Sequence, residues 1–569
     1  MTDKSEKRSS NLDDIAKNAA ENTLALNPLV ALNGEDFMAA GTNLMRAFAA
    51  NPAMVANQWM SFMGDMGNIL SDKSEIAPDP KDRRFADPAW KADRINKTMM
   101  QTYLAWAKNM ETLVEEMDLP DRDAARARLI SSLWVDAMAP SNGLLTNPTA
   151  RKQMVETNGK SVMDGFKNFM DDITKNGGLP SSVDKSKFKV GENLAVSKGD
   201  VVFKNDVLEL VHYTATTDKV YRRPLLIVPP QINKYYSVDM APGKSMIEFL
   251  LANGIQPYCI SWRNPTSQQR DWEMATYIDA LDEACDAAMD ITGADSVNIM
   301  GSCSGGITLS TYVGWLAHNK KQDKINSVII AVCVLDTMAD TGSDMAALVT
   351  PATIEAAKQV SETQGILDGE EMAKMFAWMR PNDLIWNYWV NNYLMGNSPP
   401  AFDVLYWNAD TTRLPKGLHH DFLNMAYSNP FMEEGVSQVG NVTIDMSKVK
   451  YDTYVIAGTT DHITPWTGVY ETARLYGPKT TFILSNSGHL QSLLNPPGNP
   501  KSWYMKAPAK QDDPEAWAES AKKHEGTWWL DWAETLQKKS GTQVKAPKSP
   551  GNATFPSLGA APGEYVFEP

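Results

Sequence analysis

The spacing of apolar and polar positions changes once along the chain, at a cluster of helix-breaking residues. Over residues 1–180 apolar residues recur with a helical period, in amphipathic segments such as 34–50 and 97–117. The sequence Asn-Gly-Gly-Leu-Pro at 176–180 then interrupts this period. We therefore predict a helical N-terminal domain over 1–180 and a second domain that begins at residue 181.

Beyond residue 190 short apolar runs alternate with helical segments. One helical face recurs over 274–291, and a further helix is expected from Gly306. The runs expected to form strands are 201–203, 207–213, 224–228, 256–260, 297–300, 328–335, 451–457 and 480–484. The run 224–228 is apolar throughout, as expected for a strand buried on both faces. The alternation predicts an α/β domain over 181–540 with a mostly parallel, doubly wound sheet.

Two segments depart from this alternation. Residues 337–445 are rich in Trp, Tyr, Asn and Met, and we expect this late insertion in the sheet to form a lid. Residues 541–569 are rich in Pro, Gly and Ala, and we expect them to form an extended C-terminal tail that packs loosely.

Composition and charge narrow the class of protein. The 569 residues are 43% hydrophobic and 22% charged, which is typical of a globular chain. With 54 Lys and Arg against 69 Asp and Glu, the formal charge is −15, which argues against a nucleic-acid partner held through phosphate contacts. The first residues lack the apolar stretch of a signal peptide, and the run 328–335 is far too short to span a membrane. We therefore expect a cytoplasmic protein without a transmembrane segment.

The cysteines do not indicate a disulfide framework or a zinc site. Only four occur in the chain, Cys259, Cys285, Cys303 and Cys333, and no two of them have the spacing of a zinc pair. We find no other metal-ligating cluster and no glycine-rich phosphate loop in the sequence. We therefore expect no metal and no redox cofactor.

One cysteine stands in a motif that carries chemistry. The sequence Gly-Ser-Cys-Ser-Gly-Gly at 301–306 follows the predicted strand 297–300 and opens a predicted helix, which is the nucleophile-elbow pattern of the α/β-hydrolase fold with cysteine in place of serine. Glycines on either side of the nucleophile allow a strained strand-to-helix turn. The turn would raise the Cys303 Sγ above the sheet at a helix N-terminus, whose dipole favours a thiolate. The alternative is a glycine-rich turn with a buried, inert thiol.

The same fold requires an acid and then a histidine after later strands. Asp461 follows the predicted strand 451–457, and His489 follows the predicted strand 480–484. We expect Asp461 to orient His489, and His489 to act as the general base. An aspartate after a strand is also a common helix cap, so the assignment of Asp461 depends on its position one loop before His489.

The remaining histidines compete for the same role. His462 adjoins Asp461 and is a candidate accessory residue for positioning or charge stabilisation. His212, His318 and His524 are expected in packing or surface positions, while a ligand role stays open for the pair in the lid, His419 and His420.

An oxyanion hole needs two backbone N–H donors. We expect one from Ser304, directly after the nucleophile, and the other from the loop 229–234 after the strand 224–228. The first two residues of this loop are prolines, which have no N–H, so Gln231, Ile232 or Asn233 must donate, and we expect Ile232.

Taken together, these residues resemble those of the polyhydroxyalkanoate synthases, from near Glu21 to the end of the chain. The stretches that carry the resemblance are 229–236, 261–265, 301–306, 380–388, 461–466 and 488–489. The resemblance implies a catalytic triad of Cys303, Asp461 and His489 on an α/β-hydrolase fold. Finer features, at 20–28, 231–232 and 485–489, resemble the Pseudomonas-type medium-chain class II subgroup.

One residue departs from that subgroup. Its members usually have serine where this chain has Cys333, directly before Val-Leu-Asp-Thr. A changed side chain at this position would reshape the acyl pocket, so the preferred acyl length stays open.

The resemblance implies a defined reaction. The Cys303 thiolate attacks the thioester of (R)-3-hydroxyacyl-CoA and releases CoA, and a 3-hydroxyl deprotonated by His489 then attacks an acyl thioester to form an ester. Repetition builds a polyester. The resemblance also implies attachment to polyhydroxyalkanoate granules in the cytoplasm and a homodimer as the active form.

Two alternatives belong to other classes of function. The first is a lipase, esterase or thioesterase on the same fold, which transfers the acyl group to water. The second is a structural protein that coats granules without catalysis.

Overall fold

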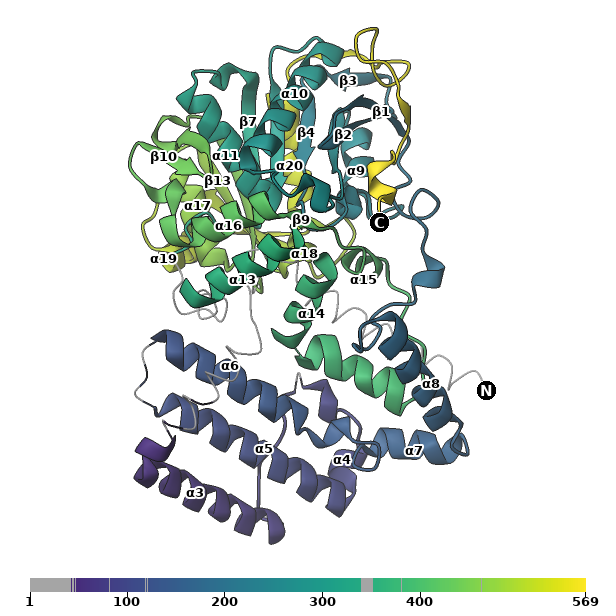
Figure 1. The fold of residues 1–569 in the computed structure, drawn as a ribbon, viewed down its shortest axis with the longest axis vertical. Helices are drawn as coiled ribbons and strands as arrows, with labels where there is room; N and C mark the ends of the chain where they lie inside the picture. The colour runs from purple at the N-terminus through teal and green to yellow at the C-terminus, as the bar shows by residue number, and fades with distance from the viewer. Residues whose placement is uncertain are drawn as a thin grey trace.

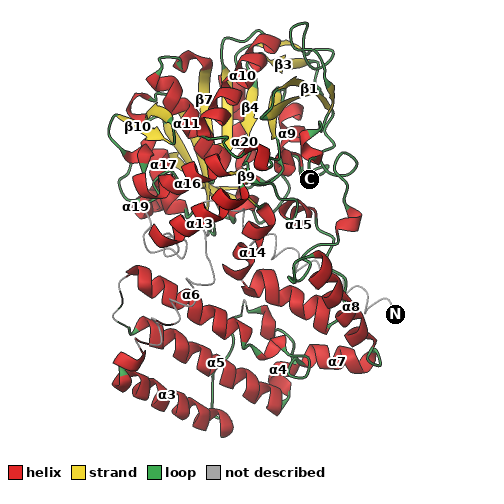
Figure 2. Ribbon diagram, viewed as in Figure 1, coloured by secondary structure: helices red, strands yellow, loops and turns green. Residues whose placement is uncertain are grey.

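The computed structural model describes most of the chain. The described residues are 42, 46, 48–80, 82–117, 119, 121–338, 351–379, 381–461 and 463–569. Most of the helical segment expected over 34–50 lies outside them. Figure 1 shows an all-helical part at one end of the molecule and a part built on a sheet at the other, and Figure 2 shows the same division by secondary structure.

The N-terminal part is helical in all its larger described elements. These helices are α3 (Pro52–Leu70), α4 (Ala89–Ala92), α5 (Arg94–Glu115), α6 (Asp121–Ala137), α7 (Pro148–Glu156) and α8 (Lys160–Lys175). The α5 helix begins after Asp93, whose carboxylate accepts a hydrogen bond from the N–H of Asn96, and Asn147 caps α7 in a similar way. The helix expected over 97–117 is confirmed as α5.

The N-terminal helices contact the insertion that follows the middle of the sheet. The α8 helix packs against η8 (Trp389–Leu394), where the Asn168 side chain donates hydrogen bonds of 3.0 and 2.9 Å to the carbonyls of Asn392 and Asn397. A Cβ atom at Gly165 would lie 1.9 Å from the Tyr393 carbonyl oxygen, so this close approach requires glycine. The helical part is therefore held to the sheet-containing part through the insertion.

Over the described residues, an eleven-stranded sheet forms the centre of the second part, in the order β15-β14-β13-β12-β7-β6-β4-β5-β2-β1-β17. The bounds are β1 (Gly199–Lys204), β2 (Leu208–Tyr213), β4 (Leu225–Val228), β5 (Pro257–Trp262), β6 (Val297–Ser302), β7 (Ile325–Ala331), β12 (Asp452–Gly458), β13 (Thr480–Ser485), β14 (Trp503–Pro508), β15 (Lys522–Glu525) and β17 (Gly559–Ala560). The six strands from β5 to β13 in this order are parallel, which confirms the predicted centre. Antiparallel strands at both ends make the whole sheet mixed.

Helices cover both faces of the sheet because successive strand residues point to opposite sides. In β4, Leu226 and Val228 belong to one core with α10, α11, α17 and α19, while Leu225 and Ile227 belong to a second core with α9, α18 and α20. The bounds are α9 (Met246–Ala252), α10 (Met274–Thr292), α11 (Ser304–His318), α17 (Trp466–Leu475), α18 (His489–Leu493), α19 (Pro514–Ser520) and α20 (Trp528–Lys539). The double winding is therefore as predicted.

One predicted strand begins and ends earlier than expected. The run 328–335 was expected to be strand throughout, but β7 ends at Ala331. Val332 has a φ of 46°, and its N–H still donates to the Ile456 carbonyl, at 2.8 Å. The chain therefore leaves the ladder at Val332, and Cys333 lies after the strand rather than in it. A positive φ is rare for a β-branched residue, and no pattern of apolar residues indicates it.

The insertion consists mainly of short helices, and Figure 1 shows α13 and α14 between the sheet and the N-terminal helices. Its described elements are α13 (Pro351–Gln364), β8 (Ile366–Leu367), α14 (Gly369–Met379), η7 (Asn382–Trp386), η8 (Trp389–Leu394), α15 (Asp403–Asn408), β9 (Leu414–Pro415), α16 (Lys416–Ser428), η9 (Pro430–Met432), β10 (Val436–Val439) and β11 (Val442–Asp445). Both η7 and η8 are π-helical.

The end of the chain is packed, which corrects the expectation for 541–569. The strand β16 (Gln543–Lys545) pairs with β3 (Lys219–Tyr221), and β17 pairs with β1 at the edge of the sheet. Tyr565 and Val566, in the 3-10 helix η11 (Tyr565–Phe567), are buried. The strands that pair with this segment lie more than 300 residues earlier, so its local composition could not reveal them.

Candidate active site

Cys303 occupies the sharp turn between β6 and α11. Its backbone has φ 50° and ψ −127°, and a non-glycine residue in such a conformation costs about 1–3 kcal/mol. The Cys303 N–H donates to the Ala331 carbonyl at 3.0 Å, and its own carbonyl accepts from the N–H groups of Gly306 and Ile307. The parallel strand on one side and the helix on the other therefore hold the strained residue in place.

The glycines of the motif are required by close packing around this turn. A Cβ at Gly301 would lie 2.8 Å from the Gly305 carbonyl oxygen and 2.9 Å from the Leu309 Cβ. A Cβ at Gly305 would lie 2.4 and 2.5 Å from the carbonyl oxygens of Val228 and Pro229. The elbow is thus pressed directly against the end of β4 and the loop expected to hold an oxyanion donor.

We expect Gly305→Ala to lower the free energy of unfolding by about 3 kcal/mol, because the added methyl group meets backbone atoms that cannot rotate away. Thermal or urea unfolding of the full chain measures the loss. The matched control is Gly67→Ala in α3, where nothing lies within 4 Å of the added Cβ. An equal change in the two variants would contradict the close packing.

Asp461 and His489 follow adjacent parallel strands, β12 and β13, whose last residues are paired in register. The His489 Nδ1 lies 2.8 Å from the Asp461 Oδ2, and both side chains are buried. Parallel strands end at one edge of a sheet, and β12 also pairs with β7 beside β6. The topology therefore places the predicted acid and base at the edge where Cys303 lies.

Sequence reasoning did not identify Thr464 as part of this site. The Asp461 carboxylate accepts hydrogen bonds from the N–H groups of Ile463, at 2.9 Å, and Thr464, at 3.0 Å, and from the Thr464 hydroxyl, at 2.6 Å. These donors fix the carboxylate for its bond to His489. The only signal in the sequence was a threonine three residues after an aspartate, which is equally common in simple turns.

The surroundings of His489 favour its protonated form. Burial lowers the pKa of His489, but the charge and hydrogen bond of Asp461 outweigh burial and raise it, with a smaller contribution from Cys303. The Nε2 atom is buried and makes no hydrogen bond of regular geometry within the described residues. The Cys303 thiol therefore lies near enough to influence the ring but makes no regular hydrogen bond to Nε2.

The other thiols are unsuited to nucleophilic attack. Burial raises the pKa of Cys285 to about 12 and raises the pKa values of Cys259 and Cys333 well above their ordinary range. Cys333 packs beneath the elbow, since a Cβ at Gly306 would lie 2.9 Å from its Sγ. The neutral thiol of Cys333 thus packs against the elbow as an apolar group. Cys303 remains the candidate nucleophile among the four cysteines.

The two expected oxyanion donors lie on adjoining segments. Ser304 is the first residue of α11, so its N–H has no acceptor within the helix. In the loop after β4, the Gln231 N–H donates to the Ser304 hydroxyl at 3.3 Å, which removes Gln231 from the candidates. We find no acceptor for the Ile232 N–H in the described part of the chain.

Residues of the insertion donate hydrogen bonds to the backbone carbonyls of this loop. The Thr412 N–H donates to the Ile232 carbonyl at 2.9 Å, and the Thr412 hydroxyl donates to the Gln231 carbonyl at 2.5 Å. The indole N–H of Trp407 donates to the Lys234 carbonyl at 2.7 Å. All three bonds are accepted by carbonyl oxygens, so none of them uses the Ile232 N–H.

The other histidines are placed away from this chemistry or cannot be placed. His462, the candidate accessory residue, lies outside the described residues. His212 and His524 each stack on a tyrosine ring, and His419 is buried with its Nδ1 2.9 Å from a serine hydroxyl. His318 is exposed near the end of α11.

Comparison with protein families first identifies the class of fold. The family described as alpha/beta hydrolase fold matches residues 224–496, in agreement with the double winding and the elbow. The family described as Poly-beta-hydroxybutyrate polymerase (PhaC) N-terminus matches residues 81–250.

Relatives then identify the family. Poly(3-hydroxyalkanoate) polymerase 1 of Ectopseudomonas oleovorans is 47% identical over 98% of this chain and 99% of its own length. Poly(3-hydroxyalkanoate) polymerase 2 of the same organism is 44% identical over 95% of this chain and 96% of its own length. The poly(3-hydroxyalkanoate) polymerase subunit PhaC of Cupriavidus necator is 35% identical over 92% of this chain and 90% of its own length. The chain belongs to the poly(3-hydroxyalkanoate) polymerase family, which confirms the resemblance seen in its sequence. Among the described residues no helix is long and apolar enough to cross a membrane.

Proposed function

We propose that the chain is an acyltransferase that polymerises (R)-3-hydroxyacyl-CoA into polyhydroxyalkanoate and releases CoA. The observation that carries this proposal is the position of Cys303 at a strained elbow, on the sheet edge that also holds the buried His489–Asp461 pair. The names of the relatives, all poly(3-hydroxyalkanoate) polymerases, support the same reaction.

In the first step the Cys303 proton is held on His489, whose raised pKa favours this thiolate–imidazolium pair, and the thiolate attacks the thioester carbonyl. Negative charge develops on the carbonyl oxygen, where the N–H groups of Ser304 and Ile232 would stabilise it. The carbon–sulfur bond to CoA then breaks, and the CoA thiolate takes the proton from His489. The acyl group is left as a thioester on Cys303, and the raised pKa of His489 suits a residue that must hold a proton during this exchange.

In the second step a 3-hydroxyl group attacks an acyl thioester. His489 takes the hydroxyl proton, the new ester bond forms, and the departing sulfur of Cys303 recovers the proton. Thiolate is both a strong nucleophile and a good leaving group, so an acyl group on cysteine stays reactive enough to be passed on. Asp461 stabilises the imidazolium that forms in both steps.

The burial of the site favours a hydroxyl acceptor over water. Cys303 is only 8% exposed, and His489 is 5% exposed. Burial keeps water away from an acyl thioester at this position and so protects it from hydrolysis. The acyl group then stays available for transfer to another hydroxyacyl unit. The covering segments must then admit the substrate, in line with the lid expected over 337–445.

We extend the proposal to the setting of the enzyme. It would work without a metal or redox cofactor, in the cytoplasm, as a homodimer attached to the surface of its polyester granule. Large apolar side chains exposed on the N-terminal helices, among them Trp134, Met163 and Phe166, support contact with an apolar surface or with a second subunit. We also propose the domain limits 1–180, 181–540 and 541–569.

Purified full-length protein tests the reaction directly. It is supplied with short- and medium-chain (R)-3-hydroxyacyl-CoA in competition, and released CoA, free hydroxy acid and insoluble polyester are measured together. We expect CoA and polyester to appear in step, and the polymer composition gives the acyl preference. Stoichiometric free acid would instead indicate a thioesterase, and no CoA release would indicate a structural protein.

A further inference from the structure

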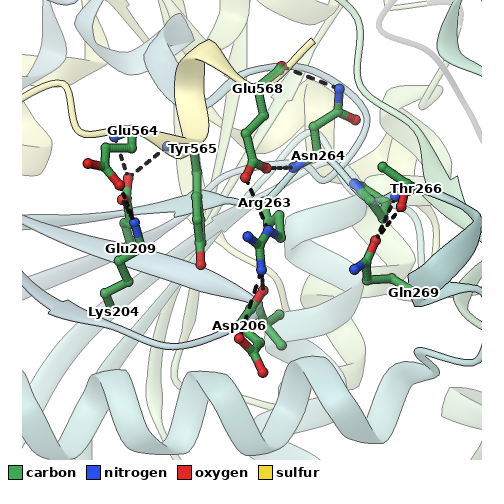
Figure 3. Close-up of polar contacts among 12 residues, drawn as sticks. Lys204, Asp206, Glu209, Arg263, Asn264, Thr266, Gln269, Glu564, Tyr565 and Glu568 are labelled. Atoms are coloured by element: carbon green, nitrogen blue, oxygen red, sulfur yellow. Dashed lines mark hydrogen bonds and ion pairs between the residues drawn. The ribbon is translucent and has the colours of Figure 1, made fainter.

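The packed end of the chain runs along the sheet edge to the catalytic loops. We call residues 559–568 the C-terminal clasp. It begins as β17 beside β1 and continues through η11 to Glu568 (Figure 3). Its contacts fall into two anchors, one on the outer strands and one on the loops after β4 and β5.

The first anchor is a buried carboxylate on β2. Glu209 is 1% exposed, and its Oε2 accepts the N–H groups of Glu564, at 2.9 Å, and Tyr565, at 3.0 Å. Lys204 compensates the buried charge, with its Nζ 2.9 Å from the Glu209 Oε1. A Cβ at Gly563 would lie 2.4 Å from Glu209, so the clasp lies directly on this carboxylate.

An aromatic ring joins the two anchors. The Tyr565 ring has the Lys204 Nζ 4.4 Å and the Arg263 Cζ 4.6 Å from its centroid, and its hydroxyl donates to the Asn205 carbonyl at 2.7 Å. Cations near a ring face are attracted by its quadrupole. Arg263, in the loop after β5, therefore contacts the ring of Tyr565, which is itself bound to the first anchor.

The second anchor is Glu568. Its carboxylate accepts the Arg263 Nε, at 3.1 Å, and the Asn264 N–H, at 3.2 Å (Figure 3). Its backbone carbonyl accepts the Lys234 Nζ at 2.6 Å. Asn264 continues the network, because its side-chain oxygen accepts the Arg413 N–H of the insertion at 2.9 Å.

Lys234 links this anchor to the candidate oxyanion loop. It lies two residues after Ile232 and is 5% exposed, so its ammonium group depends on protein partners in place of water. Burial lowers the pKa of Lys234, and the negative charges of Asp410 and Glu568, which act to raise it, offset this only in part. The Glu568 carbonyl is its hydrogen-bond acceptor. Loss of that bond would leave a buried cation without an acceptor among the residues that the structure describes, and would displace the loop that carries it.

We propose that the C-terminal clasp positions the loop 229–234, and with it the Ile232 N–H, for acyl transfer. Lys234 and Glu568 are positioning residues in this account, since they act through the loop. The inference rests on the proposed function, in which that N–H stabilises the oxyanion. An oxyanion donor must be placed within a few tenths of an ångström, so a loop held by an independent segment controls the rate of the chemical step.

The experiment uses the full chain with three changes. Glu568→Ala removes the carboxylate, and Glu568→Gln keeps an oxygen acceptor of the same shape. Lys234→Met keeps an apolar stem of similar length without the donor. The control is Glu564→Gln in the same segment, whose exposed side chain contacts Lys204 and no part of the oxyanion loop.

Two measurements distinguish the effect of the clasp on the loop from the effect of the substitutions on the reaction. The first is kcat and KM for CoA release from (R)-3-hydroxyacyl-CoA. The second is hydrogen exchange of residues 229–236 without substrate, which reports on the loop whether or not the enzyme polymerises. We expect Lys234→Met and Glu568→Ala to lower kcat by on the order of tenfold to a hundredfold with little change in KM, and to speed exchange in the loop. Glu568→Gln keeps one of the two acceptor oxygens and should recover part of both losses.

Defined outcomes would overturn the proposal. Unchanged exchange and unchanged kcat in Lys234→Met would do so, and so would an equal loss in Glu564→Gln. A rise in KM at constant kcat would assign these residues to substrate binding instead. If Glu568→Ala fails to fold, Lys234→Met decides by the same criteria. If the unmodified protein releases no CoA, the proposed function fails, while loop exchange still decides whether the clasp holds the loop.

Discussion

Replacing Cys303 with alanine is expected to abolish CoA release while the protein stays folded. The change removes the atom that attacks the thioester, and loss of a nucleophile of this kind costs a factor of about 10⁴ or more in turnover. The side chain is small and the strained backbone stays as it is, so stability should change little. CoA release from (R)-3-hydroxyacyl-CoA and thermal unfolding of the same preparation are the measurements.

Cys285→Ala provides the matched control for this result. It removes an equally small thiol, buried on the inner face of α10 and away from the strand ends. We expect turnover in the control to stay within about twofold, because no proposed step uses this residue and substitutions outside the reacting groups rarely alter chemistry. Residual CoA release from Cys303→Ala at the rate of the control would show that the nucleophile lies elsewhere.

Asp461→Asn is expected to lower turnover by about 10⁴-fold, the loss seen when an orienting aspartate is replaced by its amide. The carboxylate accepts four hydrogen bonds, and an amide cannot accept all of them in the same arrangement. The side chain keeps its shape, so the loop should keep its fold. CoA release in a rapid-mixing experiment measures the rate.

The same variant tests the electrostatics of the site. Asp461 is the main reason that the pKa of His489 is raised, so its loss should lower that pKa. A raised pKa means that the ring keeps its proton as the pH rises through neutrality, and the variant ring should lose its proton at lower pH. NMR titration of the histidine signals reports the shift. An unchanged pKa of His489 together with unchanged turnover would show that Asp461 does not orient or stabilise His489 in the reaction.

The sequence predicted the parallel centre of the sheet because its signals are local. The run that became β4 is apolar throughout and bounded by prolines, and the glycines around Cys303 mark the elbow that follows β6. Once those strands are parallel, their ends share one edge, so Cys303, Asp461 and His489 could be placed on it from chain order alone. The geometry of their side chains still required the structure.

The features that the sequence missed depend on distant partners. The end of β7 follows from a positive φ at Val332, which no local composition requires. The clasp is packed because Glu209, about 355 residues earlier in the chain, accepts its backbone N–H groups. Gln231 could be removed as an oxyanion donor only when its N–H was found on the Ser304 hydroxyl. Long-range pairing of this kind leaves no periodic trace in either partner.

The central claim is that the acyl group passes through a thioester on Cys303. The most direct test mixes the protein with (R)-3-hydroxyacyl-CoA, quenches it in acid before many turnovers, and measures the mass of the peptide that carries Cys303. We predict an increase equal to one or more hydroxyacyl units on that residue, absent from Cys303→Ala. CoA released in full with an unmodified Cys303 peptide, or with the acyl group on another residue, would contradict the account.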